Sequence, residues 1–294
     1  LLLHFDDEQA MAQRLAQASG ITCAAIARHR FPDGELKLRL PATVPTHVVL
    51  LRSLDHPNEK LVELLLATRT ARALGATHLT LVAPYMAYMR QDIAFNPGEV
   101  VSQQVVGRFL ADLFDAVVTV DPHLHRIERL EQAIPVAQAV VLSGAPLLAE
   151  LLARELDRPV LIGPDAESAQ WIAQAASAHG FDHGVCHKDR HGDREVTIHL
   201  PDLDVRGRAV VVLDDVASSG RTLAGATRLL LAAGAASVDV AVIHALFAGD
   251  ALDVIHNAGV RQVWSTDCIA HTSNAVSVAP ALTRALCTIL SSSQ

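Results

Sequence analysis

The stretch Ala209-Val210-Val211-Val212-Leu213-Asp214-Asp215-Val216-Ala217-Ser218-Ser219-Gly220-Arg221-Thr222 decides the fold. Its apolar start is rich in β-branched residues and short for a helix, so it predicts a strand over 208–213 that ends at two adjacent acids. A turn of small residues follows, and then a helical segment from Leu223 to Ala233 that stops at Gly234. A strand, acids, a hydroxyl and glycine loop and a helix are typical of a turn that binds phosphate. The alternative is an ordinary turn with an acidic helix cap.

The two acids have natural partners at such a place. Ligands of open α/β sheets bind at the carboxyl ends of the strands. Carboxylates there accept hydrogen bonds from sugar hydroxyls or bind a hydrated Mg²⁺.

The same alternation of strand and helix runs along the chain. An amphipathic helix is predicted over Asn58 to Leu74, closed by Gly75. This rhythm predicts an α/β fold with mostly parallel sheets flanked by helices. A faint duplication pairs 117–121 with 210–214, which predicts two similar domains with a boundary near Ser143. The predicted strands are 47–51, 78–83, 116–120, 159–163, 208–213, 237–243 and 261–264.

Composition narrows the class of protein. The 294 residues exceed a usual single domain, and half of them are hydrophobic. A net charge of −8 argues against nonspecific binding of nucleic acid. The four cysteines show no C-x-x-C spacing, which favours reduced thiols over zinc ligands. No leader and no apolar run of about 18 residues is found, so we expect a cytoplasmic protein without a membrane span.

The loop from Asp214 to Thr222 resembles the phosphoribosyl-pyrophosphate (PRPP) loop of type I phosphoribosyltransferases and PRPP synthetases. The resemblance implies that this loop binds ribose 5-phosphate. Ser218 stands where many members have a third acid, as in the archaeal-type branch of the synthetases. Arg221 stands where a second glycine is usual. The residues that the resemblance assigns to ribose 5-phosphate are Asp214, Asp215, Ser218, Ser219, Gly220, Arg221 and Thr222.

Three further segments resemble the ATP site of the synthetases, also called ribose-phosphate pyrophosphokinases. Phe31-Pro32-Asp33-Gly34-Glu35 is similar to a segment that reaches a neighbouring subunit's adenine in that family, although Pro-Asp-Gly is also a common hairpin turn. Arg90-Gln91-Asp92 follows the strand at 78–83, and Arg90 suits a polyphosphate because its planar fork binds oxygens bidentately. His123 follows the strand at 116–120 and corresponds to a ligand of the ATP-bound Mg²⁺. The resemblance therefore assigns ATP to Phe31, Asp33, Glu35, Arg90, Gln91, Asp92 and His123.

Two last segments complete the resemblance. Asp165 ends another strand and corresponds to an aspartate that contacts metal or ribose. Lys188 and Arg190 match the K-x-R that opens the catalytic flexible loop, although a plain charged hairpin is the alternative for this segment. All of these segments occur in family order.

The resemblance implies two type I phosphoribosyltransferase-like domains. Residues 1–142 form the ATP side, and the C-terminal helix 280–294 is expected to join them, as it does in relatives. Residues 143–279 form the ribose 5-phosphate side. The implied reaction transfers the β,γ-diphosphoryl group of ATP to the 1-hydroxyl of ribose 5-phosphate, giving PRPP and AMP. It needs Mg²⁺, with His123 and Asp165 as metal ligands and Lys188 and Arg190 as catalytic residues. The family also implies a homo-oligomer built from dimers.

Two other functions remain open at this stage. A phosphoribosyltransferase that consumes PRPP needs only the Asp214–Thr222 loop and leaves the other segments unexplained. A non-catalytic, synthetase-like regulatory subunit is favoured by the altered loop and by Pro122 in place of the family's leucine. Retention of His123 and of both loop acids argues against this second reading.

Overall fold

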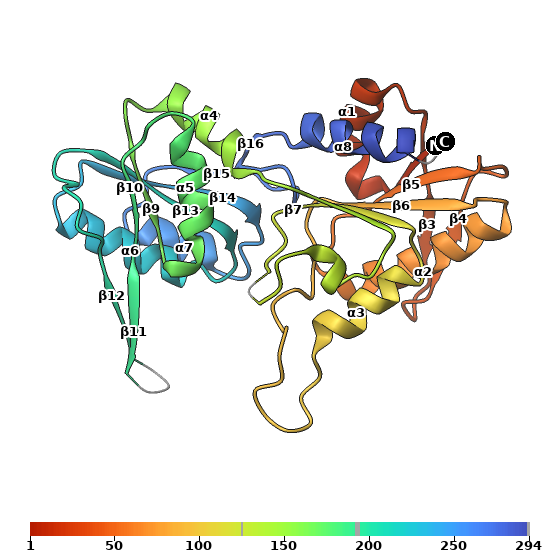
Figure 1. Cartoon of the computed structure of the whole chain (residues 1–294), viewed down its shortest axis with the longest axis horizontal. Helices are drawn as coiled ribbons and strands as arrows, with labels where there is room; N and C mark the ends of the chain where they lie inside the picture. The colour runs from red at the N-terminus through yellow and green to blue at the C-terminus, as the bar shows by residue number, and fades with distance from the viewer. Residues whose placement is uncertain (125, 192–194, 293–294) are drawn as a thin grey trace. The chain divides into compact units, whose positions relative to one another are not determined.

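The chain forms two compact units. The structure, a computed structural model, describes residues 1–124, 126–191 and 195–292, except for the side chains of 188–191, 195–197 and 292. Unit 1 comprises Leu1–Leu142 together with Val278–Gln294, and unit 2 comprises Ser143–Ser277. Each unit is an α/β fold around one parallel sheet flanked by helices (Figure 1).

Unit 1 is built on a six-stranded parallel sheet in the order β2-β1-β5-β6-β7-β8. Figure 1 shows α1 and α8 on one face of this sheet and α2 and α3 on the other. Strands β5, β6 and β7 are almost entirely buried because apolar residues occupy both of their faces. The strands are β1 (Leu2–His4), β2 (Cys23–Ala25), β5 (His47–Leu51), β6 (His78–Ala83), β7 (Ala116–Val120) and β8 (Gln138–Leu142). The helices are η1 (Asp6–Glu8), α1 (Gln9–Ser19), α2 (Pro57–Ala73), α3 (Ser102–Ala111), η2 (Leu130–Gln132) and α8 (Ala279–Ser292).

Unit 2 has a second six-stranded parallel sheet in the order β10-β9-β13-β14-β15-β16. Helix α4 packs with α5, and α6 packs with α7. The strands are β9 (Val160–Gly163), β10 (His183–Val185), β13 (Ala209–Ala217), β14 (Ser237–Ala245), β15 (Val263–Thr266) and β16 (Asn274–Val276). The helices are α4 (Ala145–Glu155), η3 (Ala166–Ser168), α5 (Ala169–Ser177), α6 (Arg221–Ala232) and α7 (Ala251–Asn257).

The two units share one strand order. In each, the second strand along the chain is at the edge, followed by the first, third, fourth, fifth and sixth. Each unit also has an antiparallel hairpin between its second and third strands. These hairpins are β3 (Ala27–Arg30) with β4 (Leu36–Arg39), and β11 (His187–His191) with β12 (Glu195–His199).

This order corrects the duplication predicted from sequence. Residues 117–120 belong to β7, the fifth strand of its sheet, and residue 121 directly follows it, whereas 210–214 belong to β13, the third strand. The counterpart of β13 in unit 1 is therefore β5. Apolar runs of similar length are common to all buried parallel strands, so resemblance between two of them does not establish equivalent positions.

The predicted strands agree closely with the structure, with one informative difference. The strand that carries the acidic pair continues to Ala217, so Asp214 and Asp215 lie within β13 and do not follow it. Helix α6 begins at Arg221, two residues before the predicted start. Among the described residues, no helix combines the length and the apolar character that a membrane crossing requires.

Candidate active site

Three carboxylates gather at the carboxyl edge of the unit 2 sheet. Asp165 directly follows the turn that ends β9, and Asp214 and Asp215 lie on β13, which pairs with β9 in parallel. Asp215 is buried, whereas Asp214 and Asp165 are half-buried. The N–H of Asp215 donates to Asp214 Oδ1 (3.0 Å), and the N–H of Val216 donates to Asp215 Oδ1 (2.8 Å). The sheet register thus brings Asp165 close to the adjacent pair Asp214 and Asp215, which follows about 50 residues later in the sequence.

These acids repel one another. Burial, then the neighbouring charges of Asp215 and Asp165, raise the pKa of Asp214 well above its ordinary value. A carboxyl group in this state is poised either to hold a proton or to be neutralised by a bound cation or by hydroxyl donors. Ligand binding at this edge would therefore relieve an unfavourable charge.

The loop after β13 is shaped by one glycine. Gly220 has φ = +70°, in the left-handed region, and caps the amino end of α6. A Cβ atom at this position would lie 2.8 Å from the carbonyl oxygen of Ala251 and 2.9 Å from the side chain of Ile255. The loop Ser218-Ser219-Gly220 therefore needs glycine here in order to turn directly into the helix. Its backbone N–H groups and the first turn of α6, with Arg221 and Thr222, form a site suited to an anion.

Lys188 and Arg190 lie on β11, where they pair with Ile198 and Val196 of β12. The backbone of this segment forms an antiparallel hairpin, which is compatible with both readings of its sequence. The side chains of both residues lie outside the described part of the structure. Residues 192–194 lie outside it altogether.

In unit 1, Arg90 is presented by a tightly held loop after β6. Met86, Ala87 and Met89 are buried, whereas Arg90 is exposed and forms no ion pair with another described residue. Gln103, in the first turn of α3, holds the backbone on both sides. Its side-chain Nε2 donates to the carbonyl of Met89 (3.1 Å), and its own N–H donates to the carbonyl of Gln91 (3.2 Å). The loop thus fixes the Arg90 backbone while leaving its guanidinium open to a ligand.

Gln103 is a residue that sequence reasoning missed. It is 3% exposed, and no local pattern marks a glutamine in a helix as a loop clamp. We predict that Gln103→Leu, which leaves the Met89 carbonyl without its donor, lowers the free energy of unfolding by about 1–3 kcal/mol. We also expect it to weaken ATP binding more than ribose 5-phosphate binding. Calorimetric titration of each substrate checks this, and an equal loss for both would contradict a local effect on Arg90.

Asp92 is held by a partner that the sequence did not indicate. Its Oδ1 accepts a hydrogen bond from Arg126 Nη1 at 2.6 Å, and the Asp92 side chain is only 2% exposed. This ion pair links the loop after β6 to the segment after β7, where His123 is half-buried. Asp121, between β7 and His123, has φ = +33°, which is strained for a residue with a side chain. Such strain is concentrated at functional edges, and here it marks the edge that carries Arg90 and His123.

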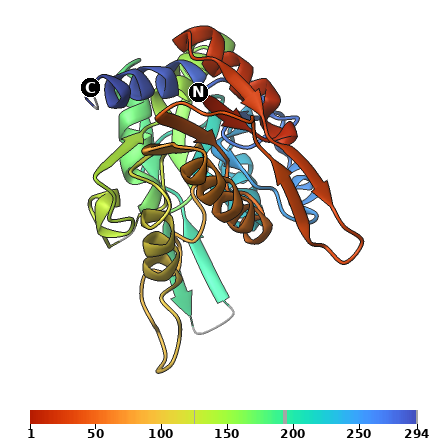
Figure 2. The same ribbon diagram turned by 90° about the vertical axis from the view of Figure 1, so that its right-hand side faces the viewer.

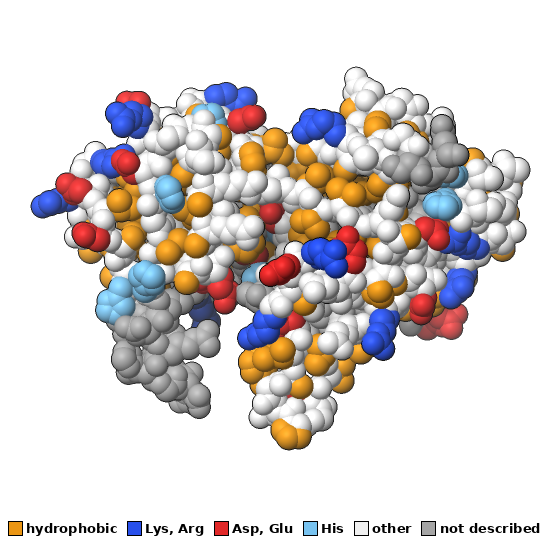
Figure 3. Space-filling model, in the orientation of Figure 1, with side chains coloured by type: hydrophobic (Ala, Val, Ile, Leu, Met, Phe, Trp, Pro, Cys, Tyr) orange, Lys and Arg blue, Asp and Glu red, His pale blue; other side chains and the backbone are white. Residues whose placement is uncertain are grey.

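Figure 3 shows apolar side chains at the tip of the loop that leads from β6 to α3. The exposed apolar residues of this segment include Phe95 (68%) and Val100 (65%). The loop therefore has a backbone that is held in place near Arg90 and an apolar tip.

The hairpin β3–β4 carries Phe31, Asp33 and Glu35 at its tip. The N–H of Phe31 donates to the carbonyl of Glu35 (2.8 Å), and the N–H of Glu35 donates to Asp33 Oδ1 (3.2 Å). Phe31 is 40% exposed, which is unusual for a phenylalanine. Figure 2 shows this hairpin, in red, extending away from the sheet of unit 1. An exposed aromatic face on the same hairpin tip as two carboxylates is suited to a planar base with an exocyclic amine.

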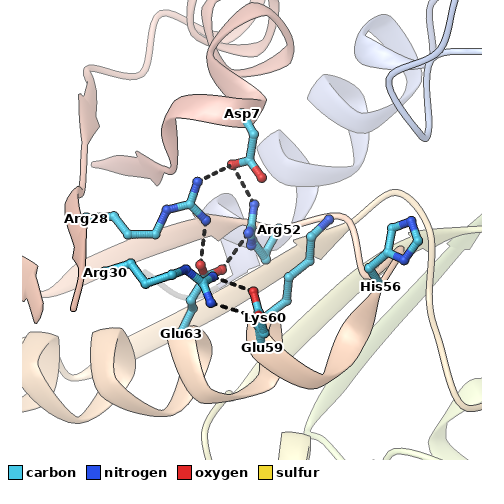
Figure 4. Close-up of a pocket in the computed structure, with 8 residues that line it drawn as sticks. All are labelled: Asp7, Arg28, Arg30, Arg52, His56, Glu59, Lys60 and Glu63. Atoms are coloured by element: carbon cyan, nitrogen blue, oxygen red, sulfur yellow. Dashed lines mark hydrogen bonds and ion pairs between the residues drawn. The ribbon is translucent and has the colours of Figure 1, made fainter. Parts of the chain in front are cut away.

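A network of ion pairs lies beside this hairpin and lines a cavity of about 370 Å³ (Figure 4). At its centre Arg52, only 1% exposed, pairs with Asp7 (2.8 Å) and Glu63 (2.5 Å) and lies 4.6 Å from the ring centroid of Phe5. Arg28 of β3 also pairs with Glu63, at 2.5 Å. Lys60 pairs with Asp55 at 2.6 Å. Since each cation lining the cavity is held by a carboxylate, the charges of this cavity largely satisfy one another.

Glu8 belongs to the same network and has an unusual ionisation. Burial raises the pKa of Glu8 from 4.5 to about 8. The positive charge of Arg52 and the hydrogen bond that Glu8 accepts from the Ser53 N–H act in the opposite direction. The folded protein therefore binds a proton that the unfolded chain releases, and the free energy of unfolding falls as pH rises from about 4.5 to 8. Glu8→Gln keeps the acceptor and removes the titration. We expect the variant to match the wild type at pH 5 and to melt about 2–4 °C higher at pH 8.

Thermal unfolding at both pH values measures this effect, with Glu128→Gln, on an exposed carboxylate, as the matched control. A variant that melts lower than the wild type at pH 8 would show that ionised Glu8 stabilises the fold.

The described residues fit a divalent cation by their chemistry. Oxygen donors are what Mg²⁺ prefers, and the raised pKa of Asp214 shows a surplus of negative charge beside Asp165. Among residues that the structure describes, no three acidic, histidine or cysteine side chains form a ready metal cage.

Comparison with known proteins identifies the family. The model for the N-terminal domain of ribose phosphate pyrophosphokinase matches residues 1–113, and that for the phosphoribosyl transferase domain matches 136–276. A ribose-phosphate pyrophosphokinase from Methanopyrus kandleri is 35% identical over 94% of this chain and 94% of its own length. The chain belongs to the ribose-phosphate pyrophosphokinase family. A ribose-phosphate pyrophosphokinase from Halobacterium salinarum is 34% identical over 97% of this chain and 100% of its own.

The two ribose-phosphate pyrophosphokinases just compared are archaeal, as Ser218 in the PRPP loop predicted. A solved phosphoribosylpyrophosphate synthetase from Mycobacterium smegmatis has the same fold, with a TM-score of 0.86 and 22% identity over 99% of both chains. The family assignment covers both units, whereas a phosphoribosyltransferase that consumes PRPP would account for the PRPP loop alone.

Proposed function

We propose that this protein transfers the β,γ-diphosphoryl group of ATP to the 1-hydroxyl of ribose 5-phosphate, giving PRPP and AMP. The observation that carries the proposal is the pair of half-sites. Unit 2 has the acids of β13 beside a turn suited to an anion. Unit 1 has Arg90, whose backbone is held by Gln103, and His123 after the neighbouring strand. Membership of the family over nearly the whole chain supports both halves together.

On the sugar side, unit 2 holds ribose 5-phosphate. The 5-phosphate lies in the turn from Ser218 to Thr222, where backbone N–H groups, hydroxyls and the guanidinium of Arg221 neutralise it. Asp214 and Asp215 accept hydrogen bonds from the ribose hydroxyls and so orient the 1-hydroxyl. Such orientation can lower a barrier by about 7–11 kcal/mol in favourable cases.

On the nucleotide side, unit 1 holds ATP. Arg90 binds the polyphosphate, with Gln91 and Asp92 shaping the loop and with His123 on the neighbouring strand end. The ribose 1-oxygen forms a bond to the β-phosphorus while the bond from that phosphorus to the AMP oxygen breaks. Negative charge spreads over the transferring group, and the cationic residues that each unit offers to stabilise it are Arg90 in unit 1 and Lys188 and Arg190 in unit 2. Asp214, with its raised pKa, is suited to accept the proton that the hydroxyl releases.

Asp165 in unit 2 and His123 in unit 1 are each suited by their chemistry to be a ligand of Mg²⁺. When bound, the ion supplies positive charge to the phosphoryl oxygens and lowers the charge repulsion among the reacting groups. Asp165 lies close enough to Asp214 to raise its pKa, so a bound cation would relieve the repulsion between these two carboxylates.

We also propose a homo-oligomer built from dimers, in which Phe31–Glu35 reaches the ATP site of a neighbouring subunit. The exposed aromatic tip supports this role. At low ATP concentration, where each variant is impaired alone, mixing Phe31→Ala and Arg90→Ala subunits should give about a quarter of wild-type activity, since half of the dimers are mixed and each has one complete site. Recovery of no activity would place the hairpin in its own subunit's site. We also propose that the protein is cytoplasmic, because its four cysteines form no disulfide with one another and a reducing compartment keeps such thiols reduced.

The direct test measures AMP formation from ATP and Mg²⁺, with and without ribose 5-phosphate, in the wild type and in Lys188→Ala. We expect AMP only when the sugar phosphate is present, with a loss of about a thousandfold in the variant. Absence of AMP despite binding of both substrates would favour the non-catalytic regulatory subunit.

A further inference from the structure

The hairpins of the two units occupy equivalent positions, residue by residue. In unit 1 the N–H of Ile26 donates to the carbonyl of His4 at 2.8 Å. In unit 2 the N–H of Cys186 donates to the carbonyl of Gly163, also at 2.8 Å. Counting two and four residues onward from these bonds, Arg28 corresponds to Lys188 and Arg30 corresponds to Arg190.

The strand ends correspond in the same way. Leu3 of β1 pairs with Leu50 of β5, and its counterpart Ile162 of β9 pairs with Val212 of β13. Two residues onward, Arg52 therefore stands at the position of Asp214. By the same count, Asp6 stands at the position of Asp165. The cavity of Figure 4 is thus the counterpart in unit 1 of the acidic half-site of unit 2.

The charge at the central position is reversed between the two copies. In unit 2, Asp214 lies among other carboxylates, and its pKa is raised. In unit 1, the buried guanidinium of Arg52 lies among the carboxylates of Asp7 and Glu63. The guanidinium of Arg52 thus supplies, from the protein itself, positive charge that balances these carboxylates.

The hairpin of unit 1 is fastened to α2 by two ion pairs in register. Arg28 pairs with Glu63, and Arg30 pairs with Glu59 through Nη1 and Oε1 at 2.8 Å. Residues two apart on a strand and four apart on a helix both repeat on one face at about 6–7 Å, so the two elements match along their lengths. Helix α6, the counterpart of α2 in unit 2, has no acidic residue between Arg221 and Ala232.

We infer that the unit 1 copy of the half-site acts as a latch that fixes the β3–β4 hairpin, with Arg28 and Arg30 as positioning residues for Phe31, Asp33 and Glu35. The latch ends directly before the hairpin tip, since Phe31 follows Arg30. It converts the tip from a flexible loop into a preformed adenine contact, which lowers the entropy lost on binding ATP. This inference rests on the proposed role of Phe31–Glu35 in ATP binding.

The outer pair, Arg30 with Glu59, provides the test because both side chains are largely exposed (45% and 63%). Arg30→Glu places two carboxylates opposite each other, whereas the exchange Arg30→Glu with Glu59→Arg restores the pair. We expect the single variant to raise the KM for ATP about tenfold with kcat within about twofold, and the exchange to return KM near the wild-type value. Lys37→Glu, on the exposed β4 strand of the same hairpin, makes the same charge change and should leave KM unchanged.

Hydrogen exchange of the β3 and β4 amides gives a readout that does not depend on activity. Exchange should accelerate in Arg30→Glu, return to wild-type rates in the exchange variant, and remain at wild-type rates in Lys37→Glu. The latch is disproved if amide exchange is the same in all four proteins, or if restoring the pair does not restore KM.

Phe31→Ala separates the latch from the role of the tip. If Phe31→Ala raises KM for ATP and Arg30→Glu does not, the tip binds ATP without help from the latch, and the inference fails alone. If Phe31→Ala leaves KM unchanged, the proposed role of the hairpin in ATP binding fails, and the positioning role falls with it.

Discussion

Asp214→Asn should abolish activity and, at the same time, stabilise the unligated protein. The loss of activity follows because an amide cannot supply the charge that orients and activates the sugar, and we expect about a thousandfold lower kcat/KM. The gain in stability follows from the pKa. Burial, Asp215 and Asp165 raise the pKa of Asp214 above the value it has in the unfolded chain. The folded form therefore binds more protons, and the free energy of unfolding falls as pH rises from the ordinary pKa of an aspartate to the raised pKa of Asp214.

Asparagine removes that dependence on pH and keeps the acceptor for the Asp215 N–H. We expect the variant to melt about 2–4 °C higher than the wild type at pH 7.5 and without added cation, with a difference that shrinks toward pH 4. Added Mg²⁺ should raise the melting temperature of the wild type more than that of the variant. Asp253→Asn, on the exposed surface of α7, is the matched control. A variant that melts below the wild type at every pH would show that the Asp214 carboxylate stabilises the unligated fold.

Arg90→Ala should lower kcat/KM for ATP by about a thousandfold, or about 4 kcal/mol, without changing thermal stability. The structure separates the two effects because the Arg90 guanidinium is exposed, whereas the backbone beneath it is held by Gln103. Arg90→Lys keeps the charge but loses the planar fork, so we expect an intermediate loss of about 10–100-fold.

Steady-state kinetics with ATP varied at saturating ribose 5-phosphate, together with thermal unfolding, measure both quantities. Arg69→Ala, on an exposed position of α2, removes a comparable charge away from the site and should change neither. Equal kinetic losses in Arg90→Ala and Arg69→Ala would mean that Arg90 acts through the general field of the protein and not by contact.

Local patterns predicted much of this fold from the sequence. Buried parallel strands are continuous apolar runs, so β5, β6 and β7 were predicted within their observed bounds. The motifs at their carboxyl ends were also placed correctly, because a strand followed by an acid or a histidine already specifies the edge of the sheet. These features depend on residues that are close together in the sequence.

Contacts between distant residues were not predictable in this way. The pairing of Asp92 with Arg126 spans 34 residues, and that of Arg52 with Asp7 spans 45. Nothing in the local sequence distinguishes Arg52 from an exposed arginine, although it is almost completely buried. The correspondence of β5 in unit 1 with β13 in unit 2 could not be predicted either. It depends on strand order in the sheets and not on the similarity of two apolar runs.

The place of the final helix has a consequence for the order in which the chain folds. Helix α8, formed by Ala279–Ser292, packs on α1 and belongs to unit 1, whereas unit 2 is one continuous segment (Figure 1). During synthesis, α1 leaves the ribosome long before α8, the helix on which it packs. Unit 2 can complete its core earlier, so the second unit of the sequence would be the first to reach its native state. A nascent chain stopped before Val278 would expose the apolar side of α1 and depend on chaperones at that stage.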